Sequence, residues 1–461
     1  MIEMELEPFD QQRYVAEIAT GKPQVRDGRL LSKPNMLSDV CVNRDALATL
    51  LYSGTIYPPQ TIFQDHAAIG MGGRLRIDQD SIHYESDANL FADGGGASDD
   101  VFDCIDLLAE SIERSDLDVD NATLLLSEGK DSTGIALALA QLGRRVPCFT
   151  FANADSNVEY VEFLARKLGF PLTVFRYQQM AITEDALDRL GSVFEPTTDQ
   201  AFLSFLLLPM ERFQGQTLLD GMGNDLYMGH LPSANQYRAM RLCSRVEKIF
   251  PEGVRNRLRD MRSSDHPSSG VPFRSFTECQ GLYNGLSESL ISASTHGKVQ
   301  KLTDLDRGWK SHGFERSRAL SRGRFLDNYS YSGKSIALAE MADGRVYFPW
   351  ADPGIAKRFL STNDQDRFQW PTVNKLMLRD AISKRLNYQQ PKVGFQAPIA
   401  DILTHNRKLV EKAIDASLTI GDDLKAFLKS LKPTSPRLSC VFLYALWEMA
   451  HNERVSRSTG L

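Results

Sequence analysis

A short polar turn between two apolar segments carries the strongest chemical signal in the chain. The run 122–126 is short and apolar enough for a buried strand, and the Ala/Leu-rich run from Ile135 predicts a helix. The first backbone N–H groups of a helix lack partners within the helix and lie at the positive end of its dipole. The turn therefore predicts a phosphate site. The residues expected to form it are Ser127, Gly129, Lys130, Asp131 and Ser132.

The side chains of the turn suit a magnesium-bound phosphate. Ser127, Ser132 and Thr133 would add hydroxyl donors, and Gly129 would let the backbone approach the ligand closely. Asp131 would give a hard oxygen to a magnesium ion that bridges phosphates. The turn lacks the spacing of a Walker loop and the glycines of a dinucleotide fingerprint. The alternative is an ordinary strand-to-helix turn with an N-capping serine.

The elements around the turn alternate between strands and helices. Strands are predicted at 122–126, 147–151, 172–175 and 216–219. Helices are predicted at 101–114, 158–168, 372–386 and in the C-terminal part. Alternation of this kind predicts an α/β fold, a parallel sheet flanked by helices, with ligands at the carboxyl ends of the strands. The phosphate turn follows such a strand end.

The N-terminal region has a different pattern. Residues 1 to about 40 show no strong periodicity and are expected to be irregular, whereas 45–51 predicts an amphipathic helix. A hairpin is expected from 74–77 and 81–84, followed by a Gly/Asp/Ser-rich linker. We therefore expect a small N-terminal unit over residues 1–95 and an α/β domain over residues 96–461, without internal repeats.

Composition limits the classes of function. The chain has 53 basic and 59 acidic residues, and the net charge of -6 argues against nonspecific nucleic-acid binding. Its apolar runs are too short to cross a membrane, and the acidic start does not resemble a signal peptide. The six cysteines are scattered, which fits a reducing compartment without structural zinc. The expected location is the cytoplasm.

Several motifs in one order point to a family. The Ser-x-Gly-x-Asp-Ser spacing at 127–132 resembles the pyrophosphate loop (PP-loop) of the ATP pyrophosphatases. Four later segments resemble signature segments of asparagine synthetases. They are 218–225 with Gly229 (S-G-E-G-x-D-E-x-x-G-G), 341–352 (M-A-x-G…P-F-L-D), 374–381 (K-x-x-L-R-x-A) and 392–398 (K-x-G-F-x-x-P). The chain thus resembles the class B asparagine synthetase-like synthetase domain of the PP-loop superfamily over roughly residues 45–400.

The resemblance implies a fold of the adenine nucleotide α-hydrolase type and an AMP-forming ligase that uses ATP and Mg²⁺. Asp131 and Asp225 match the aspartates that hold magnesium, and Lys392 matches the family's catalytic lysine. Main-chain groups near Leu126, Phe151 and Gly221 would recognise adenine and ribose. Read without the resemblance, Asp225 caps a turn and Lys392 is a surface lysine before a glycine.

The chain departs from the family pattern in two places. Residues 52–77 resemble only the last part of a glutaminase domain, and Ile2 stands where that domain needs a nucleophilic cysteine. We therefore expect no ammonia release from glutamine. Glu128 replaces the first loop glycine, and Met222 and Leu226 replace acids of the second segment. These changes put asparagine itself in doubt as the product.

The expected function is an ATP-dependent ligase that adenylates a carboxylate and joins it to ammonia or an amine. A separate glutaminase is a possible nitrogen source, and a homo-oligomer is possible. The alternative is a non-catalytic nucleotide-binding homologue or a partner subunit of a glutaminase, motivated by Glu128 and Met222.

Roles stay open for several residues near the motifs. Lys375 and Arg379 lie one turn apart on the predicted helix and face either the site or solvent. Glu195 and Asp199 lie in a segment that lines the substrate pocket in relatives, and either is equally a helix-start acid. For Glu159 the structural role at a helix start is favoured.

Overall fold

A computed structural model gives the structure of the chain. It describes residues 2–12, 14–19, 23–27, 41–78, 81–86, 102–115, 117–152, 158–231, 234, 237–238, 286–300, 319–386, 397–433 and 435–459. In this part of the chain no helix combines the length and apolar character that a membrane crossing requires.

A five-stranded parallel sheet lies at the centre of the molecule. Its strands in chain order are β7 (Ala122–Leu125), β8 (Cys148–Ala152), β9 (Leu172–Arg176), β10 (Thr217–Leu219) and β11 (Arg345–Tyr347). In space the order is β11-β10-β7-β8-β9, and neighbouring strands pair in parallel. The predicted α/β class with a parallel sheet is confirmed. β11 was not predicted, because it is only three residues long and follows a loop-like segment.

The strand order has a reversal at β7. From β7 the chain moves outward through β8 and β9, and then returns to the other side of β7 to form β10 and β11. The loops after β7 and β10 therefore leave the same edge of the sheet in divergent directions. In sheets of this kind, ligands bind in the crevice between two such loops.

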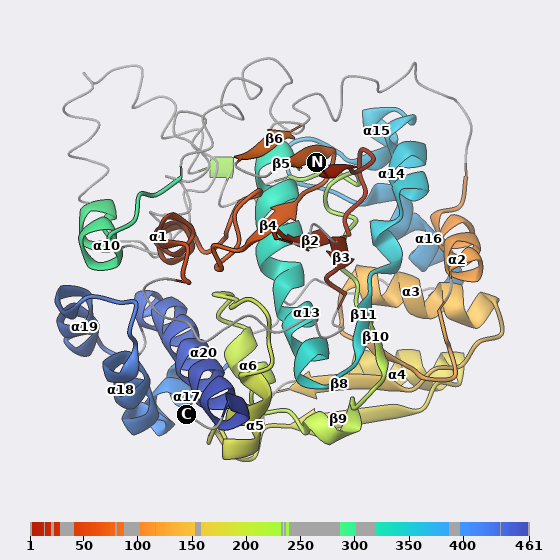
Figure 1. Cartoon of the computed structure of the whole chain (residues 1–461). Helices are drawn as coiled ribbons and strands as arrows, with labels where there is room; N and C mark the ends of the chain where they lie inside the picture. The colour runs from red at the N-terminus through yellow and green to blue at the C-terminus, as the bar shows by residue number, and fades with distance from the viewer. Residues whose placement is uncertain are drawn as a thin grey trace.

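Helices cover both faces of the sheet (Figure 1). The face to the right in Figure 1 packs against α2 (Cys104–Arg114), α3 (Lys130–Gln141), α4 (Glu159–Leu168), α14 (Pro353–Leu360) and α16 (Leu376–Leu386). The other face packs against α5 (Glu184–Leu190), α6 (Phe202–Phe205), α13 (Ser332–Met341) and α20 (Pro436–Thr459).

Alternation along the strands divides the apolar core into two layers. Leu124 and Leu219 belong to the cluster that contains α2, α3 and α4, whereas Leu125 and Leu218 belong to the cluster that contains α13 and α20. Successive side chains of a strand point to opposite faces, so strands buried on both sides are apolar throughout. The run 122–126, apolar except for Thr123, largely meets this requirement, which is why the sequence predicted the strand.

The remaining elements surround these layers. The helices α10 (Glu288–Thr295), α17 (Ile399–His405), α18 (Arg407–Ala416) and α19 (Asp422–Lys429) extend the cluster around α20. Four further helices in the described part of the chain are short or not of the α type: η1 (Met210–Arg212), the π-helix η2 (Ala319–Tyr331), η3 (Pro349–Ala351) and α15 (Asp364–Arg367).

The N-terminal region forms two small antiparallel sheets and a helix. The sheets are β1-β5-β6 and β3-β2-β4, and the helix is α1. Their bounds are β1 (Ile2–Glu5), β2 (Tyr14–Glu17), β3 (Pro23–Val25), α1 (Arg44–Ser53), β4 (His66–Ile69), β5 (Gly73–Asp78) and β6 (Ser81–Ser86). The predicted helix and hairpin are confirmed. The expectation that residues 1–40 lack regular structure is wrong for β1, β2 and β3.

The N-terminal region and the α/β part share an apolar core. The cluster around α20 includes Val15, Leu47 and Phe63 of the N-terminal region together with Phe194 and Trp447. The ring of Phe63 lies 5.3 Å from that of Phe194 and 6.1 Å from that of Trp447. Apolar packing therefore connects the N-terminal region, before residue 95, with the α/β part, after residue 96.

Candidate functional site

The turn after β7 is held by its own serines. The Ser132 hydroxyl lies 3.0 Å from the Ser127 hydroxyl and accepts the Ser127 N–H at 3.1 Å. The Gly129 N–H donates to the Ser127 hydroxyl at 3.1 Å. Gly129 is the N-cap of α3, and no side chain caps the helix there. The N-cap residue of α3 thus contributes no side-chain acceptor to the first turn of the helix.

Gly221 brings the loop after β10 against this turn. A Cβ atom at Gly221 would lie 3.0 Å from the Asp131 Cβ and 3.0 Å from the Ser132 nitrogen. This contact is closer than a side chain normally permits, so glycine lets the two loops touch. The two predicted motif segments therefore meet at the strand-order reversal.

Three side-chain oxygens contact the ammonium of one lysine where these two loops meet. The Lys375 Nζ lies 2.7 Å from the Asp131 Oδ1, 2.7 Å from the Asp225 Oδ1 and 2.7 Å from the Asn224 Oδ1. The Asn224 Nδ2 also donates to the Asp131 Oδ1 at 2.8 Å. A lysine ammonium has three donors, so these acceptors satisfy all of them. We name Asp131, Asn224, Asp225 and Lys375 the lysine cluster.

Burial and charge act in opposite directions on Lys375. Its side chain is 8% exposed, whereas those of Asp131 and Asp225 are 31% and 40% exposed. Burial alone lowers the pKa of Lys375, but the charges of both aspartates and their hydrogen bonds raise it above the ordinary value. Lys375 is therefore a fixed cation in the crevice, and the carboxylates remain partly open to solvent.

The backbone explains how Lys375 reaches this place. It has a left-handed φ of 58° immediately before α16, and its N–H donates to the Met228 carbonyl at 3.1 Å. The helix was expected to begin at Thr372 but begins at Leu376. A non-glycine residue in this conformation costs about 1–3 kcal/mol and is typical of functional sites. Of the two orientations left open for Lys375, the structure has the one that faces the site.

Arg379 occupies a different environment one turn later. Its Nε donates to the Asn374 carbonyl at 2.7 Å. Partial burial lowers the pKa of Arg379, and the Asp131 charge opposes that shift. The guanidinium therefore lies within the electrostatic reach of the lysine cluster.

Three residues for which the sequence predicted no role support the lysine cluster. Trp350 is fully buried, and its indole N–H donates to the Asp131 carbonyl at 2.9 Å. The Gln11 amide donates to the Gly223 carbonyl at 2.8 Å, so the N-terminal region also fixes the loop after β10. Asn224 was part of a recognised motif without a role of its own. All three contacts join residues far apart in the chain, which no local pattern reveals.

Two aspartates and an amide are a suitable donor set for magnesium. Mg²⁺ prefers oxygen ligands and is commonly held by one or two carboxylates together with substrate phosphates. Over the residues that the structure describes, no group of three or more His, Cys, Asp or Glu side chains has the arrangement of a metal site. Asp131 and Asp225 supply two carboxylates, so a magnesium ion bound here would need further ligands from elsewhere.

The departures from the family motifs have clear positions. Glu128 is half-buried in the turn before Gly129. The Met222 N–H donates to the Asp220 Oδ1 at 3.1 Å, so Met222 lies in a turn closed by that carboxylate. Leu226 is buried in the core cluster with α3. Leu226 thus has a packing role where the family has an acid.

The other predicted site residues are distributed around the crevice. The Leu126 N–H pairs with the Phe149 carbonyl at 2.9 Å, and Phe151 lies in β8 with its ring 5.2 Å from that of Phe205. Lys130 is the first residue of α3 and is half-buried. Glu159 is exposed at the start of α4, as its structural role requires. Lys392 lies outside the described residues.

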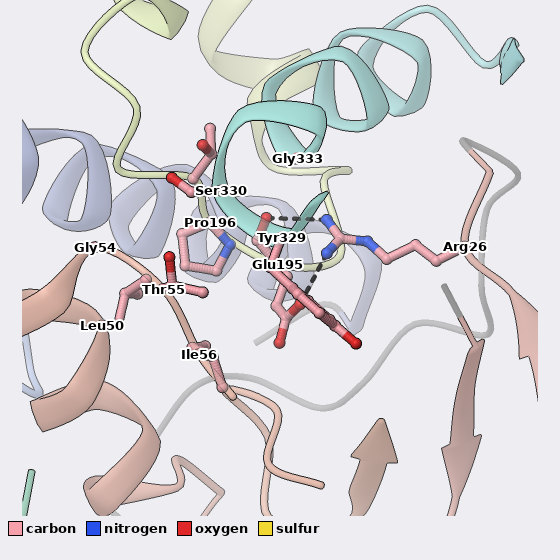
Figure 2. A pocket seen from close by; sticks show the side chains of 11 residues that line it. Arg26, Leu50, Gly54, Thr55, Ile56, Glu195, Pro196, Tyr329, Ser330 and Gly333 are labelled. Carbon is pink, nitrogen blue, oxygen red and sulfur yellow. Dashed lines mark hydrogen bonds and ion pairs between the residues drawn. The ribbon is translucent and has the colours of Figure 1, made fainter. Parts of the chain in front are cut away.

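A pocket lies where the N-terminal region meets the α/β part (Figure 2). It is a small pocket that is open to solvent. Its lining includes Thr55, Glu195, Tyr329 and Ser330, and Figure 2 shows the Arg26 guanidinium bonded to Glu195. The Asp199 carboxylate pairs with the Lys334 Nζ at 3.2 Å. Glu195 and Asp199 therefore both make ion pairs, and Glu195 also lines a pocket.

A buried ion cluster joins the pocket to the core. The Arg26 NH1 lies 2.8 Å from the Glu195 Oε2, and its Nε lies 3.0 Å from the Glu340 Oε1. The side chains of Arg26 and Glu340 are 3% and 1% exposed. Burial alone lowers the pKa of Arg26, but the two carboxylates raise it above the ordinary value. Arg26 is thus a charged link between the N-terminal region and the α/β part.

Comparison with known proteins adds no relative. No protein-family model matches the chain, and no curated protein sequence matches it significantly.

Gly221→Ala tests the close approach of the two loops. Its methyl group would press on Asp131 and Ser132, and displacements of about 1 Å near reacting groups can lower rates about 100-fold. We expect the release of pyrophosphate from ATP that the resemblance predicts to fall by about 10- to 100-fold in a folded protein. Gly143→Ala, just after the far end of α3, is the control, because its Cβ would meet no atom within 4 Å and it tests the backbone strain of a left-handed φ (69°) without a steric clash. An equal loss in both variants would contradict the steric account.

Proposed function

We propose that the chain is an ATP-dependent, AMP-forming ligase with a fold of the PP-loop type. It would adenylate a carboxylate and transfer the acyl group to ammonia or an amine. One observation carries the proposal. Asp131 and Asp225, from the loops after β7 and β10, lie 2.7 Å from the same lysine at the strand-order reversal. The cytoplasm is the compartment we expect for this reaction.

The proposed reaction has two steps. A carboxylate oxygen attacks the α-phosphorus of ATP, which forms an acyl-adenylate and releases pyrophosphate. The amine then attacks the acyl carbon, which forms the amide and releases AMP and a proton. Charge accumulates on phosphoryl oxygens in the first step, so fixed donors and cations at the site lower its barrier. When bound, magnesium would supply further positive charge and orient the phosphates.

The residues of the crevice match the first step. The N–H groups at the start of α3 would bind the leaving pyrophosphate, because they lie at the positive end of the helix dipole. The ammonium of Lys375 places a fixed positive charge beside the same helix end. Asp131 and Asp225 would hold magnesium through their solvent-accessible carboxylates. Partial burial of the cluster strengthens each of these interactions relative to water.

One observation favours a second candidate, a non-catalytic nucleotide-binding homologue. The Lys375 ammonium already neutralises charge on both proposed magnesium ligands. A site that retained this ion pair would bind a nucleotide without aligning it for attack. Glu128 in the turn adds a negative side chain near the phosphates.

A screen of carboxylic acids tests the proposal. The full chain is incubated with ATP, Mg²⁺ and an ammonium salt or amine, and each acid is added separately while AMP and pyrophosphate are measured. We expect equimolar AMP and pyrophosphate that depend on one class of acid. Formation of ADP and phosphate, or no release with any acid, would overturn the proposal. Binding of ATP by calorimetry without turnover, lost in Asp131→Ala, would identify the non-catalytic candidate.

A further inference from the structure

The lysine cluster has the geometry of a cation site that is filled by a side chain. Its three oxygens come from two carboxylates and one amide, which are ligands that a divalent cation also prefers. All three lie 2.7 Å from the Lys375 Nζ. The Asn224 amide bridges two members, because its Nδ2 donates to the Asp131 Oδ1 while its Oδ1 accepts from Lys375. The oxygens therefore surround a common point that the ammonium occupies.

Several contacts hold the ammonium at this point. Lys375 is 7% exposed, and its backbone is fixed in a left-handed conformation by the bond to the Met228 carbonyl. Asn224 is 1% exposed. The main chain of Asp131 is held by the Trp350 indole at 2.9 Å. A lysine that met these carboxylates by chance on the surface would have none of these supports.

We infer that Lys375 is a built-in counter-ion that competes with divalent metal for Asp131 and Asp225, so that metal enters the site together with the triphosphate. This inference rests on the proposed function for the identity of the nucleotide. The competition itself involves only residues of this chain and a divalent cation.

Charge explains the order of binding. The two aspartates and Lys375 sum to a charge of −1, so one free divalent ion would give the partly buried cluster a charge of +1 and would lie close to the ammonium. Like charges at short range in a partly buried site repel strongly. A triphosphate brings its own negative charge and offers the ammonium new oxygen partners. The aspartates then become available to the metal that the triphosphate carries.

Manganese binding followed by electron paramagnetic resonance tests this competition directly. Mn²⁺ replaces Mg²⁺ as the probe and is titrated into the full chain without nucleotide. We expect weak binding by the wild type. Lys375→Met should bind Mn²⁺ at least about tenfold more tightly, because it removes the cation that contacts both carboxylates. Lys384→Met is the control, since Lys384 lies on α16, the helix that follows Lys375, but pairs with the exposed Asp380.

A second series varies the nucleotide on the wild-type chain, so the test does not depend on the folding of the variant. Addition of α,β-methylene-ATP should increase Mn²⁺ affinity at the protein by at least about tenfold, the scale of a moderate coupling free energy. The gain should be smaller in Lys375→Met, whose site is already open. Tight Mn²⁺ binding by the nucleotide-free wild type, or equal affinity in wild type and Lys375→Met, would overturn the inference.

Mn²⁺ binding and acid-dependent pyrophosphate release distinguish failure of the counter-ion inference from failure of the proposed ligase function. Tighter Mn²⁺ binding by Lys375→Met without any acid-dependent pyrophosphate release would support the counter-ion and refute the ligase. Acid-dependent release together with strong metal binding by the nucleotide-free wild type would support the ligase and refute the counter-ion.

Discussion

Asp225→Asn is expected to lower acid-dependent pyrophosphate release by about a thousandfold, because it removes one of two proposed magnesium ligands from a site that acts through charge. Asparagine has the same shape as aspartate and still accepts a hydrogen bond from Lys375, so the fold should persist. The measurement is the initial rate of pyrophosphate release at saturating ATP and acid. The same change at Asp131 should have a similar effect, because both carboxylates contact the same ammonium.

A matched control, Asp188→Asn, separates the loss of a proposed magnesium ligand from the loss of any one negative charge. Asp188 pairs with Arg457 at 3.0 Å, across α5 and α20, and takes no part in the proposed chemistry. Asp188→Asn should retain nearly the full rate. A rate in Asp225→Asn within about tenfold of the wild type would mean that this carboxylate does not act in the rate-limiting step.

Arg26→Met is expected to lower the free energy of unfolding by about 3–5 kcal/mol, because it leaves the buried Glu340 and the largely buried Glu195 without their cation. Urea unfolding followed by tryptophan fluorescence measures the change. The loss should also remove the cation–π contact with Phe194, whose ring centroid lies 5.6 Å from the guanidinium. The effect is large because a lone buried charge is costly, whereas the complete ion cluster is not.

Two further variants check the cause. Arg407→Met removes an exposed ion pair with Glu411 and should leave the unfolding midpoint almost unchanged. Arg26→Met combined with Glu340→Gln should recover part of the lost stability, because the orphaned charge is gone. A stable Arg26→Met single variant would show that the glutamates find other partners.

The sequence predicted the elements whose burial leaves a strong pattern. β7 and β8 are apolar on both faces, and α4 has a regular apolar stripe, so their positions agree within one or two residues. β1 and β2 were missed because they are four residues long and contain charged residues. β11 was missed because its identity depends on pairing with β10, more than 100 residues earlier.

The site could be predicted only as separate motifs. Alternation of strands and helices places the loops after β7 and β10 at one edge of the sheet, but their adjacency depends on the strand order. Lys375 was ambiguous because the pattern predicted a helix from Thr372, whereas a left-handed residue precedes the actual helix. A helical face and a left-handed turn direct a side chain differently, and the sequence did not distinguish them. No local sequence pattern predicted the ion cluster of Arg26, Glu195 and Glu340.

Transfer of ¹⁸O from the acid to AMP tests the central claim most directly. The acid with the highest turnover is labelled with ¹⁸O in its carboxylate and incubated with the full chain, ATP, Mg²⁺ and the amine. Attack of the carboxylate on the α-phosphorus predicts one ¹⁸O atom in each AMP and none in pyrophosphate, detected by mass spectrometry. Label in inorganic phosphate, or AMP without label, would contradict activation of the acid as an adenylate.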